Sequence, residues 1–424
     1  MKQDRTLMDF LFIAIIGGWC LVVWAEDSLP GKDVESLLAI AEERNPEYAG
    51  QRFEADAALA RVVSAGALPD PKIQIELRDI TRLGAQDPTL FPNQVGNTRY
   101  LITQEIPWFG KRELKRTVAE FEAEGSQGQA ASVWNDIAAK IKIAHAERYY
   151  LSRNERLTNE ILDLMVRLER IAETRYGNGL ATLQDVVRAQ VEQTSLRNEL
   201  IAIETEYHHR NTLINALLAR DPMTPLAEPE RLRPLPPPAK LDYAVLLLRV
   251  QSHNPLLSSA EARLAAAEKN RDLVYKNRYP DFTFGVSPIQ YQNSIKEWEL
   301  MVQVNIPLQQ SSRRAAEHES EAMLSAARMR SEMTINQVRS DLAENISGIE
   351  SVRKTETELS DRLLPQSEIN FRAALAGYEN GKVDFSTLLD AERQTRQAKQ
   401  ALLKVQLEGQ SRLAEIERVL GAAL

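Results

Sequence analysis

Few residues of this 424-residue chain have the type and spacing that catalysis or metal binding requires. His208 and His209 are adjacent, so on a helix they point to different faces and cannot chelate one ion as an i, i+4 pair would. Four scattered methionines are more typical of packing than of a copper site: Met301, Met323, Met329 and Met333. The sequence has no phosphate-binding Gly loop, nucleophile elbow or His-Glu zinc helix. We therefore expect no enzymatic activity, no metal site and no cofactor.

The composition is typical of long helices rather than of several compact cores. Gly and Pro account for 18 and 19 residues, and aromatic residues for only 6%. The net charge of -8 is spread evenly, without a basic block or an aromatic-rich basic stripe. Nucleic acid is therefore not an expected partner.

The first 25 residues have the pattern of an export signal. Lys2 and Arg5 precede an apolar run from Phe10 to Trp24, and the residues up to Ala25 offer a signal-peptidase site. An uncleaved membrane anchor is the alternative, but the run is shorter than the roughly 20 residues of a spanning helix. We interpret residues 1–25 as a cleaved signal peptide.

Cys20, the only cysteine, lies inside this apolar run. Acylation of Cys20 is an alternative, but Trp19 fits a lipoprotein signal badly. After cleavage the mature chain would have no thiol, which excludes disulfides, cysteine catalysis and thiolate metal sites. No later segment reaches spanning length, so the exported protein is either soluble in the periplasm or inserted as strands.

The chain contains an internal duplication. The segment that begins "NPEYAGQRF" at Asn45 matches the segment that begins "NPLLSSAEA" at Asn254 in order and spacing. A Pro-rich linker, residues 231–240, joins the two units and cannot be helical. We therefore expect one repeat over residues 26–230 and a second over residues 241–424.

Each repeat reads helix, strand, long loop, strand, helix. In "KIQIELR" apolar and polar residues alternate, and the segment from Trp298 to Ile306 alternates in the same way, which predicts strands with one apolar and one polar face. At Pro69 the first helix ends, because a proline cannot continue the helical hydrogen-bond ladder. Each of the four helix–strand junctions carries a proline: Pro69, Pro107, Pro280 and Pro307.

The four predicted strands of one chain are too few to close into a barrel. A soluble sandwich would show the same alternation. However, four strands in two hairpins cannot bury both faces or form a barrel, because single-chain membrane barrels begin at eight strands. Unless the subunits pool their strands, the sheet edges stay open.

Long helical hairpins carry most of the mass. The pattern runs without a proline from Lys111 to Tyr176, roughly 100 Å at 1.5 Å per residue, with the alternating spacing of four and three that marks a coiled-coil seam. It breaks at residues 177–179 and resumes to Leu218, and the second repeat has the same Asn-Gly break at residues 380–381. Glycine permits the left-handed turn that reverses a chain, so both breaks are predicted hairpin tips.

This ordered set of features resembles the TolC-type outer-membrane efflux proteins over nearly the whole mature chain. The stretch "QEIPWFGKR" (Gln104–Arg112) is similar to one in members that serve heavy-metal resistance-nodulation-division pumps. The resemblance implies a mainly α fold with a small transmembrane β part, in which three subunits pool four strands each into a 12-stranded barrel above a helical tunnel. It also implies an outer-membrane exit duct that works with a periplasmic adaptor and an inner-membrane pump.

By the same resemblance, the hairpin tips contact the adaptor through a short hydrophobic-Gly-X element. The matching positions are Asn178, Gly179 and Leu180 in the first repeat, and Asn380, Gly381 and Lys382 in the second. Both repeats have Asn where family members often have Val, and this difference bears on which adaptor binds.

The resemblance further places aspartates at the closed periplasmic entrance, at two positions three residues apart in the second hairpin. This chain has Thr387 and Asp390 there, so a trimer would hold three carboxylates in the ring instead of six. A solvated helix charge is the alternative for Asp390. Arg188, the equivalent residue of the first repeat, is interpreted as a residue that pairs helices.

Two function classes remain open. The first is the outer-membrane duct, and the second is a periplasmic coiled-coil adaptor or structural protein whose strands form a small soluble sheet. The cargo of a duct of this kind could be metal ions, drugs or polypeptides. An adaptor would have a single hairpin flanked by β-rich segments, so the duplicated hairpins and the few strands favour the duct.

Overall fold

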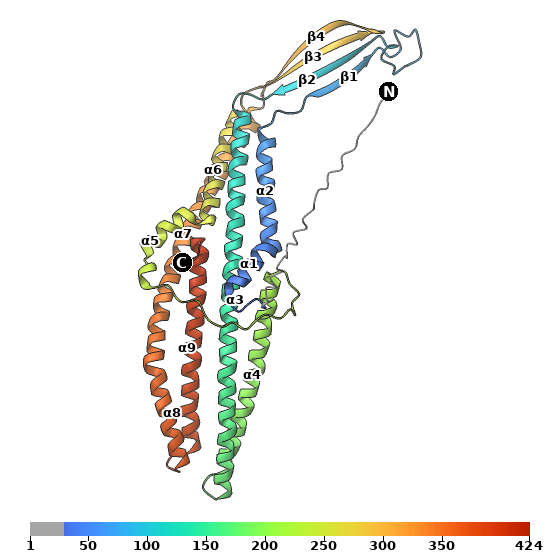
Figure 1. The fold of residues 1–424 in the computed structure, drawn as a ribbon. Helices are drawn as coiled ribbons and strands as arrows, with labels where there is room; N and C mark the ends of the chain where they lie inside the picture. Colours follow the sequence, from blue (N-terminus) through green and yellow to red (C-terminus); the bar gives the residue numbers. More distant parts are fainter. Residues whose placement is uncertain (1–28) are drawn as a thin grey trace, which may run out of the picture.

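The structure, a computed structural model, describes residues 29–424 as an elongated molecule with a sheet at one end and hairpin tips at the other (Figure 1). The predicted signal peptide and Cys20 lie outside the described residues. The helices of the N-terminal half are α1 (Val34–Arg44), α2 (Pro46–Gly66), α3 (Lys111–Gly177) and α4 (Leu183–Leu217). Those of the C-terminal half are α5 (Tyr243–His253), α6 (Pro255–Lys276), α7 (Gln310–Glu358), α8 (Leu364–Glu379) and α9 (Phe385–Leu420). Within residues 29–424, no helix combines the length and apolarity needed to cross a membrane.

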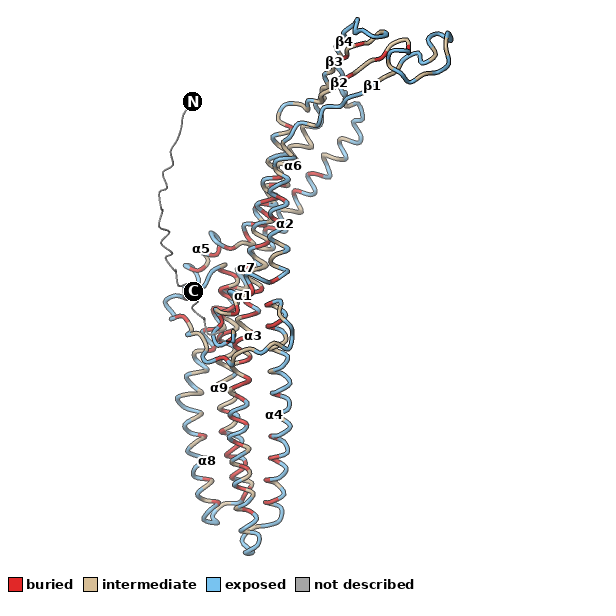
Figure 2. The backbone as a smooth tube through the Cα atoms, turned by 45° about the vertical axis from the view of Figure 1, so that its right-hand side comes forward, coloured by how far each residue is buried: buried red, intermediate tan, exposed pale blue. Residues whose placement is uncertain are grey.

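The two long hairpins form the helical part, as the sequence predicts. α3 has 67 residues, about 100 Å at 1.5 Å per residue. Nearer the sheet it packs against α2 and α6, and toward the tips it packs against α4 and α9 (Figure 1). Buried residues line the helix faces that meet (Figure 2). The core shared by the two hairpins includes Leu157, Ile161, Met165, Leu168, Leu196, Phe385 and Leu388.

The second hairpin has a break that the sequence analysis does not predict. A π-helical turn, Leu359–Leu363, connects α7 to α8. Pro365 lies in the first turn of α8 and has no N–H to donate to the helical ladder. A wider turn just before a proline is a known way for a helix to absorb the missing bond. The first hairpin has no proline at this height, and α3 continues without interruption.

The asparagine of the repeated Asn-Pro pair links two helices in each half of the molecule, near its middle. Asn45 Nδ2 donates to the carbonyl of Leu217 at the end of α4 (2.8 Å), while its Oδ1 accepts from the N–H of Tyr48 and caps α2. Asn254 makes the same pair of bonds in the other half, where Nδ2 donates to the carbonyl of Val419 at the end of α9 (2.6 Å). One buried side chain thus begins one helix and closes another.

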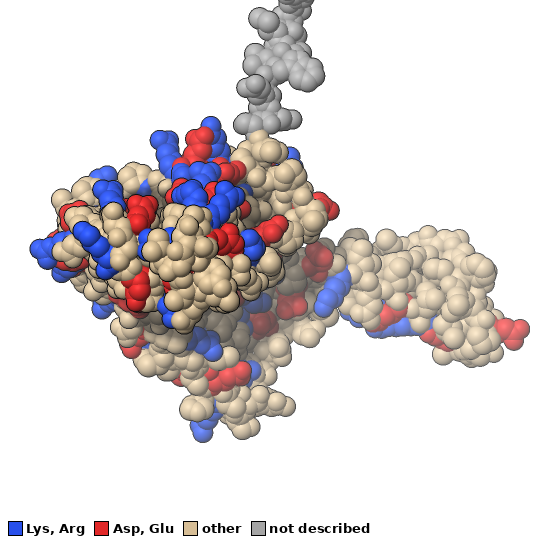
Figure 3. Space-filling view, turned by 90° about the horizontal axis from the view of Figure 1, so that it is seen from below, with Lys and Arg blue, Asp and Glu red and all other residues tan. Residues whose placement is uncertain are grey.

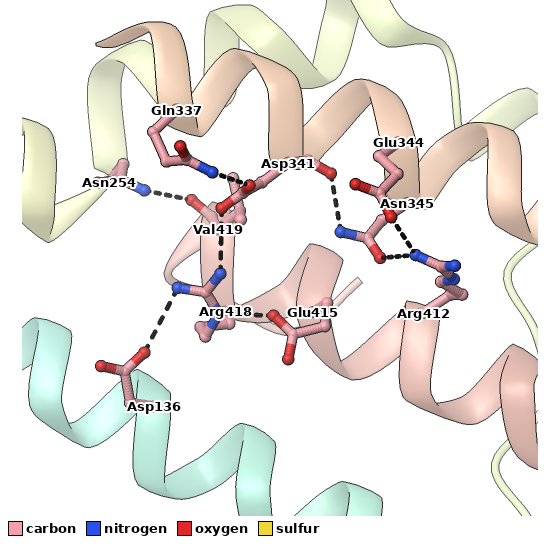
Figure 4. A network of polar contacts seen from close by, with 10 residues as sticks. All are labelled: Asp136, Asn254, Gln337, Asp341, Glu344, Asn345, Arg412, Glu415, Arg418 and Val419. Atoms are coloured by element: carbon pink, nitrogen blue, oxygen red, sulfur yellow. Dashed lines mark hydrogen bonds and ion pairs between the residues drawn. The ribbon is translucent and has the colours of Figure 1, made fainter. Parts of the chain in front are cut away.

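Arg418, near the end of α9, ties the two halves together (Figure 4). Its guanidinium lies 3.4 Å from Asp136 of α3, 3.3 Å from Asp341 of α7 and 2.7 Å from Glu415 of its own helix. Since Asp136 belongs to the N-terminal half and Asp341 to the C-terminal half, this network fixes the middle of the molecule.

The linker at residues 231–240 packs onto this middle region. Arg233 pairs with the buried Glu417 (2.8 Å), which also binds Lys142 (2.9 Å). Burial acts to raise the pKa of Glu417, but Lys142 and Arg233 outweigh it and hold the pKa below its ordinary value. The expectation that the linker has no helix is wrong at its end, where Pro238–Lys240 form one 3₁₀ turn, because a proline in a first turn needs no N–H bond.

The strands form one antiparallel sheet in the order β1-β2-β3-β4. They are β1 (Lys72–Arg78), β2 (Asn97–Ile106), β3 (Asp281–Tyr291) and β4 (Ser294–Asn305). Pairing of β2 with β3 joins the two halves into a single sheet. A long loop connects β1 to β2 as predicted, but the long loop predicted for the second repeat is wrong. There β3 and β4 extend to a tight turn at Gln292, whose φ is +55°, so the strands are longer than expected.

Candidate functional site

The sheet has one apolar and one polar face. Opposing pairs across β3 and β4 on the apolar face are Phe282–Val304, Phe284–Val302 and Val286–Leu300. Many of these side chains are open to solvent in the single subunit, and Leu300 is 87% and Ile73 71% exposed. A continuous exposed apolar sheet face of this kind is suited to contact with lipid.

The polar face carries an ion network centred on Arg99 of β2. Its Nε donates to Ser287 Oγ (2.8 Å) and lies 3.1 Å from Glu299 of β4. The same guanidinium lies 3.7 Å from Glu76 of β1. One arginine therefore reaches polar groups on the other three strands. Gln303, four residues after Glu299, lies on this face, as the alternation predicts.

The four predicted junction prolines lie between helix and strand: Pro69, Pro107, Pro280 and Pro307. At Pro107 the following residues build a rigid joint. Trp108 N–H donates to Asp281 Oδ1 (2.7 Å), and the ring of Trp108 stacks on Tyr279 with centroids 5.2 Å apart. The buried Lys111 binds the same carboxylate at 2.8 Å. The "IPWFGK" stretch thus holds the sheet at a set angle to the helices.

The first hairpin tip closes around Gly179. Its φ of +69° is left-handed, a conformation that glycine adopts without strain. The N–H of Leu180 donates to the carbonyl of Arg175 (2.8 Å), which completes a Schellman closure. Asn178 Nδ2 donates to the carbonyl of Thr174 (2.8 Å), so asparagine here caps the end of α3. Leu180 is left 68% exposed at the tip.

The second tip repeats this geometry. Gly381 has a φ of +70°, and Asn380 Nδ2 donates to the carbonyl of Ala376 (2.7 Å). The N–H of Lys382 donates to the carbonyl of Gly377 (2.8 Å). The exposed residue after the glycine is Lys382 here and Leu180 in the first tip, so one tip presents an ammonium group and the other an apolar side chain.

Arg175 joins the two tips and was not singled out by the sequence analysis. From α3 its guanidinium donates to the carbonyls of Tyr378 (2.9 Å) and Glu379 (3.1 Å) at the end of α8. It also lies over the ring of Tyr378, 5.0 Å from the centroid. Burial raises the pKa of Tyr378. The only sequence feature that pointed to this contact was the tyrosine repeated before each Asn-Gly. This repeat did not indicate that Tyr378 is buried while Tyr176 is exposed.

The predicted entrance residues differ in what they contact. Thr387 binds the N-cap residue Asp384 through both its N–H (2.9 Å) and its Oγ1 (2.5 Å), and this bond to Thr387 lowers the pKa of Asp384. Asp390 is exposed and lines a groove of about 690 Å³ between α4 and α9. Arg188 lines the same groove. In residues 29–424, neither Asp390 nor Arg188 forms an ion pair within 4.0 Å, so within the single subunit Arg188 does not link helices through an ion pair.

Further from the tips, charged side chains connect the hairpins. Glu192 of α4 is buried and binds Arg393 (2.6 Å) and Arg396 (3.0 Å) of α9. Arg396 also lies 3.7 Å from Glu199. Next to them, Glu392 is 3% exposed and has no hydrogen-bond partner among the described residues. The sequence analysis did not single out any of these residues.

The residues weighed as metal ligands do not come together. His208 and His209 are both exposed on α4. Met323, Met329 and Met333 lie exposed along α7 within this subunit, so the expectation that they are packing residues is wrong for the single chain. Within residues 29–424, no three His, Cys, Asp or Glu side chains are placed to hold one metal ion.

The charge distribution differs between the two ends of the molecule. Viewed from the tip end (Figure 3), basic and acidic side chains are interspersed over the helical part, whereas the sheet that projects to one side shows mainly uncharged residues. This contrast matches a water-exposed helical part and a sheet in an apolar environment.

The family model described as "Outer membrane efflux protein" matches residues 37–220 and 246–422. The chain belongs to the outer membrane efflux protein family. It is an efflux protein of the outer membrane, and the resemblance to TolC-type proteins is confirmed. The periplasmic adaptor alternative receives no support.

Comparisons with individual proteins agree with this assignment. The efflux protein is 24% identical over 392 residues to the cobalt-zinc-cadmium resistance protein CzcC of Cupriavidus metallidurans, an alignment that covers 92% of this chain and 90% of CzcC. Its fold is similar to that of CusC (TM-score 0.79, 17% identity, 93% of each chain). It is also similar to VceC of Vibrio cholerae (TM-score 0.78, 17% identity, 92% of this chain and 96% of VceC). These relatives are described as resistance or outer-membrane proteins rather than as enzymes.

Proposed function

We propose that this efflux protein is the exit duct of a tripartite system, built from three copies of the chain. The open sheet carries this proposal. β1 and β4 each have an unpaired edge in the four-stranded sheet, and the apolar face is exposed. Joining β4 of one copy to β1 of the next pairs every edge and closes a 12-stranded barrel, with lipid on the apolar face and water on the Arg99 face.

The duct conducts passively and performs no catalysis. The energy comes from an inner-membrane pump of the resistance-nodulation-division type, which a periplasmic adaptor connects to the hairpin tips. The adaptor contacts are Asn178, Gly179 and Leu180 at the first tip, and Asn380, Gly381 and Lys382 at the second. Leu180 supports this role because it is an exposed leucine at the far end of a polar helical hairpin.

Heavy-metal cations are the proposed cargo. The similarity to CzcC, named for cobalt, zinc and cadmium resistance, supports this choice. Asp390, exposed in the groove near the tips, would add three carboxylates at the narrow end of the trimer together with the hydroxyl of Thr387. Carboxylates in a constriction concentrate cations and repel anions.

The proposed order of the chain follows from its duplication. Residues 1–25 direct export and are removed, residues 26–230 and 241–424 form the two repeats, and residues 231–240 link them. The matching bonds of Asn45 and Asn254 support this division, because each side chain caps the C-terminal end of the return helix of its own repeat.

The assembly is tested by extraction from the outer-membrane fraction with detergent. We expect a trimer whose gel mobility changes on heating, and cells without the protein should lose tolerance to cobalt, zinc or cadmium. A monomer recovered from the soluble periplasmic fraction would contradict the duct. A trimer without any effect on metal tolerance would leave the duct intact and contradict the cargo.

A further inference from the structure

Glu392 occupies an unusual place between the two hairpins. It lies on α9 where that helix packs against α3 and α8, is 3% exposed, and neither of its carboxylate oxygens has a hydrogen-bond partner among the described residues. It borders a cavity of about 320 Å³ whose walls include Leu157, Ile161 and Phe371. An ionised carboxylate without a partner is unfavourable in such surroundings, whereas the protonated acid is tolerated.

The charged groups on α3 and α8 do not pair with Glu392. From α3, Glu160 and Arg167 line the cavity and are exposed. From α8, Glu368 and Arg372 line it, and they pair with each other at 4.0 Å. None of these groups forms an ion pair with Glu392 within 4.0 Å, so the carboxylate has no cation from either neighbouring helix.

The cations of α9 itself are engaged with other acids. Arg396, one helical turn after Glu392, binds Glu192 (3.0 Å) and lies 3.7 Å from Glu199, both on α4. Arg393 also binds Glu192 (2.6 Å), and Lys399 pairs with Glu368 of α8 (3.4 Å). The bonds from Arg393 and Arg396 to α4 are ties between the second hairpin and the first.

Burial raises the pKa of Glu392 from the ordinary 4.5 to about 7, with Arg396 opposing this rise and Glu192 adding to it. The raised value fits the geometry, since a group that is buried without a partner holds its proton. Glu392 therefore changes charge near neutral pH, unlike an exposed glutamate.

We propose that Glu392 is a proton-binding latch that holds the two hairpins together. While Glu392 is neutral, the hairpins pack around it and Arg396 stays on Glu192 and Glu199. When Glu392 loses its proton to water, the new charge needs a partner, and Arg396 is within reach as its i+4 neighbour. Arg396 then leaves α4, one tie between the hairpins is lost, and the hairpins separate. The consequence for transport rests on the proposed duct, in which such a separation widens the periplasmic end.

The direction of the pH effect follows from the raised pKa. The packed state binds the proton more tightly than a separated state in which Glu392 is solvated. The full stability of the packed state is therefore present below pH 4.5, and it is lost as the pH rises through about 7. Within this window the ratio of separated to packed hairpins rises by up to about tenfold per pH unit.

The test measures the distance between the hairpins. Spin labels are placed on cysteines at the exposed positions Glu173 of α3 and Ala373 of α8, and the distance is recorded from pH 5 to pH 8 in the parent and in Glu392→Gln. Glu392→Met provides a second neutral side chain of similar length. Glu408→Gln is the matched control, because Glu408 lies on the same helix but is exposed.

The parent and Glu408→Gln should shift toward longer distances as the pH rises, whereas Glu392→Gln and Glu392→Met should keep the short distance throughout. A parent whose distances do not change with pH, or a Glu392→Gln variant that shifts like the parent, would overturn the latch. Conductance in planar bilayers separates this result from the duct itself. A conducting channel with fixed distances contradicts the latch alone, and shifting distances without conductance contradict the duct alone.

Discussion

Replacement of Leu300 by arginine tests whether the apolar face of the sheet contacts lipid. β4 has 12 residues, so at about 3.4 Å per residue and a tilt of about 40° it spans roughly 30 Å along the membrane normal. Leu300 is five positions before the end of β4 at Asn305, which places it about 13 Å above that end, near the midplane. Its side chain is 87% exposed on the apolar face, opposite Val286.

The cost of the substitution follows from this depth. Arginine at the midplane of a membrane strand costs about 2–4 kcal/mol per subunit, and the cost falls to about 0–1 kcal/mol near the interfaces. Val302 lies nearer the helix-proximal end of β4, so Val302→Arg should cost less than Leu300→Arg. Gln303→Arg is the control, because Gln303 lies on the polar face opposite Thr283 and its arginine would reach water in the barrel.

The assay is folding into lipid vesicles across a denaturant series, with the folded fraction measured by the heat-dependent change in gel mobility. The expected order of destabilisation is Leu300→Arg, then Val302→Arg, then Gln303→Arg, and the last should mainly alter conductance. If Leu300→Arg and Gln303→Arg fold equally well, the sheet does not lie in a membrane in the proposed orientation.

Three further substitutions test the hairpin tips, the periplasmic entrance and the helix-capping asparagine Asn254. Gly381→Val should abolish metal resistance without lowering the amount of trimer. Valine in the left-handed conformation of Gly381, with its φ of +70°, is strained by roughly 1–2 kcal/mol, and this strain distorts the tip that contacts the adaptor. Gly177→Val is the control, because Gly177 has open space around it and no left-handed φ, and this variant should keep its resistance. Equal resistance of Gly381→Val and Gly177→Val would remove the support for the tip assignment. Asp390→Ala should lower cation selectivity and weaken block by multivalent cations in planar bilayers, whereas Arg188→Ala should not, and unchanged block in Asp390→Ala would identify a solvated surface charge. Asn254→Ala should destabilise the protein by about 2–3 kcal/mol in denaturant unfolding, because it removes a helix cap and leaves a buried carbonyl unpaired. A loss below about 0.5 kcal/mol would show that water replaces both bonds.

The sequence by itself was sufficient for features whose causes lie within a few residues. Gly179 and Gly381 mark the hairpin tips because a left-handed turn requires only the right residue at one position. The alternation from Trp298 to Ile306 predicted which side chains share a face, since successive strand residues point to opposite sides. The junction prolines were equally informative because a proline lacks the N–H that the interior of a helix requires, so it favours a position between elements.

Other local features were missed because they depend on how far a strand or helix extends. The turn at Gln292 carries no glycine, so the sequence did not indicate that β3 and β4 would meet there, and a long loop was expected instead. The π-turn at Leu359–Leu363 is visible only once α7 and α8 are known to continue along one axis on both sides of Pro365.

Tertiary structure decided which residues became partners across the molecule. Tyr176 and Tyr378 occupy matching positions in the two repeats, yet only Tyr378 is buried, because Arg175 of the other hairpin covers its ring. Glu392 is one of many glutamates on a polar helix, and it is buried only because α3 and α8 pack against α9 around it. Burial and ion pairing depend on which helices become neighbours. That arrangement is a property of all the long-range contacts together, so residue type and spacing within one segment do not determine it.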